Sequence, residues 1–124
     1  MNWYKKAQKN LERDLSNPSN VILYHATRKP GLIKQKGIIP SHAGVITKEN
    51  AFLVYTATTP ILAKMALQYE EELKERMGQK IRKIGDIFII KISVPYKDVT
   101  IKPNGDVVLN RVVLPSEIKE EIKS

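Results

Sequence analysis

The sequence predicts an α+β fold, because segments with helical and with strand periodicity alternate along its 124 residues. The strongest helix pattern runs from Thr59 to Gly78, where apolar residues recur every three or four positions. Short runs rich in β-branched and aromatic residues lie on both sides of it, at 21–24, 52–56 and 87–94. A chain of this length can bury one hydrophobic core, so we expect a single domain over residues 1–124.

The first segment, residues 1–16, has the pattern of an amphipathic helix that packs on the domain. Apolar residues recur there every four positions on one face, namely Trp3, Ala7, Leu11 and Leu15, with Tyr4 beside them. Turn-forming residues at 17–20 end this pattern. The apolar run 21–24 then predicts a buried strand, at whose end His25 begins to face a cleft.

Two further helices are expected in the middle of the chain. Residues 30–36 can form a short helix that Gly37 closes as its C-terminal cap. Residues 38–50 read as loop, and 52–56 as a strand. Thr59 then supplies an N-cap and Pro60 the first helical position, and the apolar stripe of the long helix is expected to lie in the core: Ile61, Leu62, Met65, Ala66, Tyr69, Leu73 and Met77.

The last third of the chain predicts strands. Residues 87–94 suit a central strand buried on both faces. Two short apolar runs, 99–101 and 107–109, flank Asn104 and Gly105, a pair that supplies the positive φ angles of a tight hairpin. A final helical turn is expected to open at Pro115.

Composition narrows the classes of function. The chain has 21 basic and 13 acidic residues, a net charge of +8 that attracts nucleic acid, nucleotides or acidic protein surfaces, although solubility alone also explains it. Only residues 79–83 resemble a basic patch. Without cysteine and with two histidines, no metal site is expected. No apolar run predicts a signal or a membrane span, so we expect a cytoplasmic protein with no membrane partner.

Three segments resemble the ADP-ribosyltransferase superfamily when read in order. Residues 23–27, Leu-Tyr-His-Ala-Thr, and the following 32–40 are similar to the family's Tyr-His-Gly-Thr strand and its next element. Residues 54–57, Val-Tyr-Thr-Ala, followed by 63–66, resemble its tyrosine segment. Residues 105–118 resemble its closing acidic strand. The resemblance covers 21–118 and implies an ADP-ribosyltransferase-like fold with small split sheets, antiparallel or mixed, and flanking helices.

The resemblance also implies roles for individual residues around NAD, which would be a substrate. If the roles known in the histidine–tyrosine–glutamate branch carry over, His25 would hold the ribose beside nicotinamide and the ring of Tyr55 would stack on nicotinamide. Ala26 stands where the family has glycine, whose backbone grips the nicotinamide amide. Further contacts would come from Thr27, Thr56 and Met65, the last at the position of a second aromatic residue. Alternatively, His25 is an ordinary strand-end histidine and Thr27 an ordinary strand residue.

The acid position falls on Asp106, one methylene shorter than the family's glutamate. The carboxylate would stabilise the charge that develops as the glycosidic bond breaks, and rifampin-modifying members of the family use aspartate. Asp98 is a rival and Glu117 a poorer one, and Asp106 equally suits a turn residue that satisfies local amides. His42, in the loop, is a weaker candidate for a substrate contact. Glu70–Glu72 read as a solvated helix face with i,i+4 ion pairs.

The leading functional hypothesis is an NAD-dependent ADP-ribosyltransferase, a glycosyltransferase that cleaves the nicotinamide bond and transfers ADP-ribose to an acceptor. The acceptor, a protein, nucleic acid or small molecule, stays open. One alternative is a non-catalytic module on the same fold that binds NAD, ADP-ribose or nucleic acid. Others are an RNA 2′-phosphotransferase relative and a plain basic nucleic-acid-binding domain.

Overall fold

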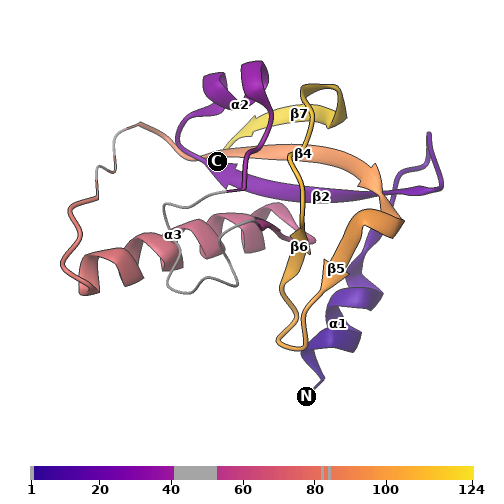
Figure 1. The fold of residues 1–124 in the computed structure, drawn as a ribbon, viewed down its shortest axis with the longest axis horizontal. Coiled ribbons are helices and arrows are strands. Elements are labelled where there is room, and N and C mark those ends of the chain that lie inside the picture. The colour runs from indigo at the N-terminus through magenta and orange to yellow at the C-terminus, as the bar shows by residue number, and fades with distance from the viewer. Residues whose placement is uncertain (1, 41–52, 82, 84) are drawn as a thin grey trace.

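The computed structural model describes residues 2–40, 53–81, 83 and 85–124, and it confirms an α+β architecture (Figure 1). The helices are α1 (Trp3–Asn10), α2 (Pro30–Lys36) and α3 (Pro60–Arg76), with the short 3₁₀ turns η2 (Tyr96–Asp98) and η3 (Pro115–Glu117). The strands are β1 (Glu12–Arg13), β2 (Asn20–Thr27), β3 (Val54–Thr56), β4 (Phe88–Pro95), β5 (Val99–Ile101), β6 (Val107–Leu109) and β7 (Ile118–Lys123). Within the described residues, no helix combines the length and the apolar composition needed to cross a bilayer.

The strands form two sheets, and every pairing in them is antiparallel. The larger sheet has the order β1-β2-β4-β7, and the smaller has the order β3-β6-β5. The central position expected for residues 87–94 is confirmed, since β4 lies between β2 and β7 and both of its faces are covered. In Figure 1, β5 and β6 run steeply across the direction of β2 and β4.

Two apolar clusters hold the larger sheet between its neighbours. Alternate residues of β2 and β4 face the smaller sheet, and they form one core with side chains from α2, β3 and β6: Val21, Leu23, Ile33, Ile38, Val54, Ile90, Ile92, Val94, Val107, Leu109 and Val113. The opposite face packs against α3 through Ile22, Tyr24, Ala26, Ala57, Ala63, Ile87 and Ile89. The larger sheet is therefore the middle layer.

The N-terminal helix is shorter than its apolar spacing predicts. It ends at Asn10, and Ala7 and Leu11 pack against the core, but Leu15 is 95% exposed and Trp3 is 53% exposed. The prediction of a helix to residue 16 was wrong because Glu12 and Arg13 pair with the edge of β2 instead. Pairing an open strand edge outweighs a marginal helical pattern in so short a segment.

The long helix begins as predicted but turns a different face to the sheet. Thr59 caps it, with its hydroxyl accepting from the Leu62 N–H at 3.2 Å. The predicted core stripe was wrong for most of its members, since Ile61, Leu62, Met65, Tyr69 and Met77 are exposed. Ala63 and Glu71 are the buried residues of α3. Ala63 packs in the cluster beneath the sheet, and Glu71 pairs with Arg28 at 2.6 Å, so this face of α3 is turned towards the end of β2.

The β5–β6 hairpin was predicted correctly, whereas its turn has a different geometry. Lys102 and Gly105 close the turn through a Gly105 N–H to Lys102 carbonyl bond of 2.8 Å. Of these turn residues only Gly105 has a positive φ, at 91°. Pro103 fixes a negative φ at the first central position, which gives the pattern of a type I turn followed by a left-handed glycine. A side chain at Gly105 would lie 3.0 Å from the Trp3 carbonyl oxygen, so the tip rests on α1.

The last strand was missed by sequence reasoning. The turn at Pro115 is confirmed as η3, and β7 follows it as an edge strand on β4. Its apolar residues, Ile118 and Ile122, are four apart, which is a helical rather than a strand spacing. A register shift opposite Lys91 and Ile92 explains this spacing, because Ile118 then reaches the core on one face and Ile122 the cluster on the other.

Candidate active site

The candidate site lies where the edge of β2 changes partners. Along its first half this edge pairs with β1. At Tyr24 the partner becomes Ala57, just after β3, through N–H to carbonyl bonds of 2.9 and 2.8 Å in the two directions. The larger sheet thus meets the smaller one at the end of β2, and the last residues of β2 lie at the junction.

A cavity of about 490 Å³ opens at this junction. Its volume lies within the range of about 300–1,000 Å³ that is usual for small-molecule sites. The lining comes from β2, the residues after α2, β3, α3 and the hairpin tip: Tyr24, His25, Ala26, Ile38, Ile39, Leu53, Val54, Tyr55, Thr56, Ala63, Ala66, Leu67, Tyr69, Glu70, Leu73, Asn104 and Asp106. The structure therefore brings together His25, Ala26, Tyr55, Thr56 and Asp106, five of the seven residues expected at the site.

His25 is held in one orientation by the strand beside it. Its Nδ1 lies 2.9 Å from the carbonyl oxygen of Tyr55. A carbonyl only accepts, so Nδ1 carries the proton and donates. Burial lowers the pKa of His25 below its ordinary value of 6.5, although the Tyr55 carbonyl and the charge of Glu70 oppose this shift. The ring is therefore neutral at pH 7, and its Nε2 carries a lone pair that can accept a hydrogen bond.

The backbone of Ala26 offers a second polar element at the junction. Alternate residues of β2 direct their backbone groups to the same edge. The Asn20 carbonyl accepts there from the Asp14 N–H, and Tyr24 exchanges two hydrogen bonds with Ala57. Ala26 is the next residue in this series. Within the described part of the chain, its N–H and carbonyl have no backbone partner on that edge. A donor and an acceptor side by side match a planar carboxamide.

Tyr55 and Thr56 have defined contacts within the smaller sheet. The Tyr55 hydroxyl accepts from the Lys102 ammonium at 3.0 Å, and the same ammonium lies 5.2 Å from the ring centroid. Lys102 thus ties the ring to the hairpin that carries Asp106. The Thr56 hydroxyl donates to the Val107 carbonyl at 3.0 Å, so it supports the sheet.

Only one of the three candidate acids lies at the cavity. Asp106 is exposed at its rim, where one carboxylate oxygen accepts from the Asn104 side-chain amide at 3.0 Å. Asp98 and Glu117 both bind Arg111 instead, Glu117 through two bonds of 2.7 and 2.8 Å. Arg111 lowers the pKa of Glu117, which makes that carboxylate a structural anion rather than a proton carrier.

Two expected site residues lie outside the lining of the cavity. Thr27 accepts from the Lys29 N–H at 3.0 Å, so its hydroxyl serves the turn into α2. Met65 is 56% exposed on α3, and its neighbour Ala66 lines the cavity instead. His42 lies outside the described residues, as does Arg82 of the predicted basic patch.

The sequence does not predict two of the lining residues at the site, because the periodicity of α3 indicates which residues pack in the core and not which line a cavity. Tyr69 brings an aromatic ring to the cavity, which the sequence reasoning had placed in the core. Glu70 brings a carboxylate and pairs with Lys74 at 3.1 Å, as its i,i+4 spacing predicted. Their spacing from Ala66 on α3, by three and four positions, is the signal that would have placed them on the same wall.

The cavity contrasts in charge with the whole chain. The chain carries +8, yet the charged residues in the described lining are Glu70 and Asp106, both acidic. The two carboxylates, together with the rings of Tyr55 and Tyr69, suit a cationic, planar group. In the described part of the chain, no cluster of three or more acidic, histidine or cysteine side chains is arranged to hold a metal ion.

The arrangement can therefore bind a flat cation with a carboxamide and a hydroxyl nearby, through Tyr55, Ala26 and His25. Comparison with known proteins adds nothing to this geometry: no family model, no curated protein and no solved structure matches the chain. The resemblance to the ADP-ribosyltransferase superfamily stays a prediction from the sequence.

Proposed function

We propose that the chain is an NAD-dependent ADP-ribosyltransferase with an ADP-ribosyltransferase-like fold. The observation that carries the proposal is the Nδ1 hydrogen bond of His25 to the Tyr55 carbonyl, which leaves the Nε2 lone pair as an acceptor at a cavity that Asp106 also lines. The pair of antiparallel sheets that meet at the end of β2 supports the fold.

The reaction breaks the bond between the nicotinamide nitrogen and the ribose C1′. The bonding pair goes to nicotinamide, which leaves as a neutral ring, and positive charge develops on C1′ and the ring oxygen of the ribose. A nucleophile on the acceptor then forms a bond to C1′ and loses its proton. An enzyme for this step must hold the leaving ring and stabilise a cation.

Each of these tasks has a candidate residue in the cavity. Nε2 of His25 is suited to accept from a ribose hydroxyl, and the N–H and carbonyl of Ala26 are suited to the nicotinamide carboxamide. Tyr55, with Tyr69 from α3, supplies aromatic faces for the ring. Asp106 and Glu70 supply negative charge for the cation.

A non-catalytic NAD-binding module is the second candidate, because of the state of Asp106. Its carboxylate is exposed and bound by the Asn104 amide, and its own N–H donates to the Asn104 side-chain oxygen at 3.0 Å. A turn residue that satisfies local amides has the same contacts. This candidate predicts NAD binding without release of nicotinamide.

Nicotinamide release from NAD, followed by chromatography, tests the proposal. We expect release by the unaltered protein, and a loss of about 100-fold or more in kcat/KM for His25→Ala and for Asp106→Asn. Tyr55→Ala should have a similar effect through the loss of its side chain, because the backbone carbonyl that orients His25 remains in that variant.

Asp86→Asn is the matched control for Asp106→Asn. Asp86 is an exposed aspartate that pairs with Lys123 at 3.1 Å and does not line the cavity, so its amide should leave turnover unchanged. Activity that survives both His25→Ala and Tyr55→Ala would refute the proposal. Calorimetric binding of NAD by the unaltered protein with no release would favour the second candidate.

A further inference from the structure

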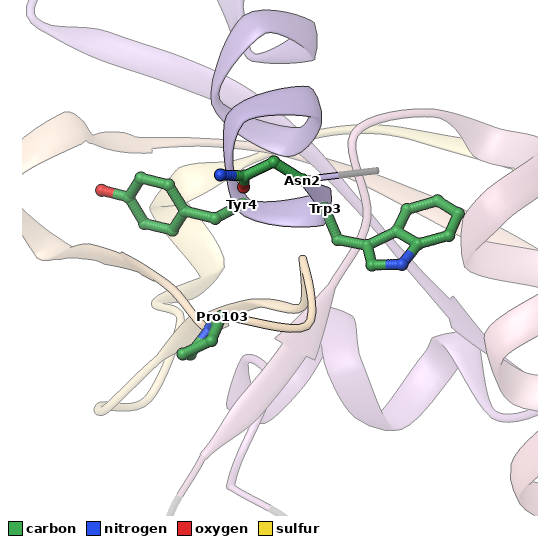
Figure 2. A pocket seen from close by; sticks show the side chains of 4 residues that line it. All are labelled: Asn2, Trp3, Tyr4 and Pro103. Atoms are coloured by element: carbon green, nitrogen blue, oxygen red, sulfur yellow. The ribbon is translucent and has the colours of Figure 1, made fainter.

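The first turn of α1 exposes aromatic rings of the kind that folded chains mostly bury. Trp3 is 53% exposed and Tyr4 is 41% exposed. Figure 2 shows their side chains extending in opposite directions from this turn, with Pro103 of the β5–β6 hairpin below them. With Asn2, these residues line an open recess of about 560 Å³.

The same helix is basic along its whole length. Its eight residues include Lys5, Lys6 and Lys9 and no acid. The Lys6 ammonium lies 5.3 Å from the centroid of the Trp3 ring. We call Asn2 to Lys6, Lys9 and Pro103 the α1 surface. It combines the cationic group of Lys6 beside the Trp3 ring with two further lysines on the same helix.

We propose that the α1 surface binds single-stranded nucleic acid. An unpaired strand offers base faces that stack on Trp3 and Tyr4 and phosphates that attract the lysines, so it matches both features at once. A duplex keeps its base faces stacked inside, and an acidic peptide supplies charge without planar faces. This binding function goes beyond the proposed NAD chemistry and does not depend on it.

The position of the surface places a bound strand next to the candidate active site. The hairpin tip rests on α1 at Gly105, and Asn104 and Asp106 on either side of that glycine line the cavity. The α1 surface and the cavity therefore share one short turn. Where the proposed function also holds, a strand bound here lies beside the cavity and is placed to serve as the acceptor of ADP-ribose.

Trp3 is the only tryptophan of the chain, so its fluorescence reports on this surface directly. We expect an unstructured DNA or RNA oligonucleotide of about 12 nucleotides to quench it. Trp3→Ala should weaken binding about 10-fold, as measured by the anisotropy of a labelled oligonucleotide. Alanine keeps the Cβ and carbonyl that contact Gly105, so the contact between α1 and the hairpin is retained.

A pair of variants with the same charge distinguishes binding at the α1 surface from non-specific electrostatic attraction to the whole chain. Replacing Lys5, Lys6 and Lys9 with Gln should weaken binding between about 50 and 200 mM salt and lower the salt slope by roughly 2. Replacing Lys29, Lys36 and Lys80 with Gln removes the same charge from exposed positions outside the α1 surface, and it should change the slope far less.

The inference would be overturned by the absence of quenching by single strands, by equal loss of binding in both triple variants, or by equally strong binding of a duplex of the same sequence. Quenching by polyglutamate at the same concentrations would assign the surface to acidic protein and also overturn it. Nicotinamide release in the same samples keeps the two proposals apart. Release without binding would overturn only the nucleic-acid site, whereas binding without release would support that site and refute the NAD chemistry.

Discussion

The two halves of β2 have the same alternation of side chains but meet different neighbours. At the closed half, β1 covers the edge of the strand, and the buried Asp14 lies behind it. At the split half, from Tyr24 to Thr27, the edge of β2 no longer pairs with β1. Tyr24 pairs with Ala57 there, and the cavity opens beside it. The two halves therefore differ in whether the polar groups beside the strand edge are satisfied within the fold.

The polar groups of the closed half are satisfied within the fold. Asp14 accepts from the Ser93 hydroxyl at 2.5 Å and from the N–H and hydroxyl of Ser16 at 3.0 and 2.7 Å. Asn20 completes the network by donating to Ser93 at 3.1 Å. At the split half, Nδ1 of His25 donates a hydrogen bond to the Tyr55 carbonyl, and Nε2 keeps a lone pair that can accept a hydrogen bond from a ligand. The closed half thus contributes stability, and the split half holds the candidate site.

Gly37→Ala should have the largest effect, because it breaks the wall of the split half. Gly37 has φ 78° and ψ −171°, a region that only glycine occupies readily, and a Cβ there would lie 2.0 Å from the Val113 carbonyl oxygen. That carbonyl accepts from the N–H of Ile38, which lines the cavity. We expect a loss of roughly 3–6 kcal/mol in the free energy of unfolding.

Gly78→Ala is the control for Gly37→Ala. Gly78 has a similar φ of 80°, but nothing lies within 4 Å of a Cβ built on it. It should cost only about 1 kcal/mol, from the backbone conformation alone. Equal midpoints for the two variants in urea unfolding would show that the contact with Val113 has no energetic weight.

The ion pair of Arg28 and Glu71 should have the next largest effect, since it joins the end of β2 to α3. Arg28 donates to the two carboxylate oxygens of Glu71 at 2.6 and 3.0 Å and to the Gly85 carbonyl at 2.8 Å. The carboxylate is 8% exposed. Glu71→Ala leaves the guanidinium without its partner in a half-buried position, so we expect a loss of about 2–3 kcal/mol.

The adjacent residue provides a control on the same helix. Glu72 pairs with Arg76 at 2.6 Å, but both side chains are more than half exposed, so Glu72→Ala should cost less than about 0.5 kcal/mol. Because the pair with Arg28 also sets which face of α3 lines the cavity, Glu71→Ala should weaken ligand binding more than Glu72→Ala. Similar unfolding curves for both variants would contradict the role assigned to the buried pair.

Local patterns predicted much of this fold. The N-cap at Thr59, the helix of residues 30–36 with its glycine cap and the hairpin strands follow from residues close in sequence, so the sequence alone was sufficient for them. Elements decided by an open strand edge were missed. Both β1 and β7 exist because β2 and β4 have edges to fill, and neither has a period-two pattern of its own.

The position of the candidate site in the fold was predictable to the same extent and for the same reason. His25 and Tyr55 meet because each lies near the end of a strand that reaches the junction, and the order of their segments in the sequence predicted that they would be close. The wall formed by α3 was not predictable, because the ion pair of Arg28 with Glu71, 43 residues away, sets the rotation of the helix. A hydrophobic pattern alone pointed to the wrong face.

The smallest expected effect on stability is the one that distinguishes the two halves of β2 by pH. Hydrogen bonds from Ser93 and Ser16 lower the pKa of Asp14 to about 2 from 3.8, so its stabilisation is complete above pH 3.8 and is lost as the pH falls towards 2.

Burial lowers the pKa of His25 below 6.5, so the folded state loses stability as the pH falls below 6.5, where the unfolded chain binds the proton first. Asp14→Asn should flatten the decline below pH 4 and leave the proposed NAD binding intact, whereas His25→Gln should flatten the decline just below pH 6.5 and abolish the proposed binding. Urea unfolding across this pH range, with calorimetry at pH 7, measures both. If His25→Gln also removed the decline below pH 4, the two halves would be one coupled unit, and the division between stability and binding would fail.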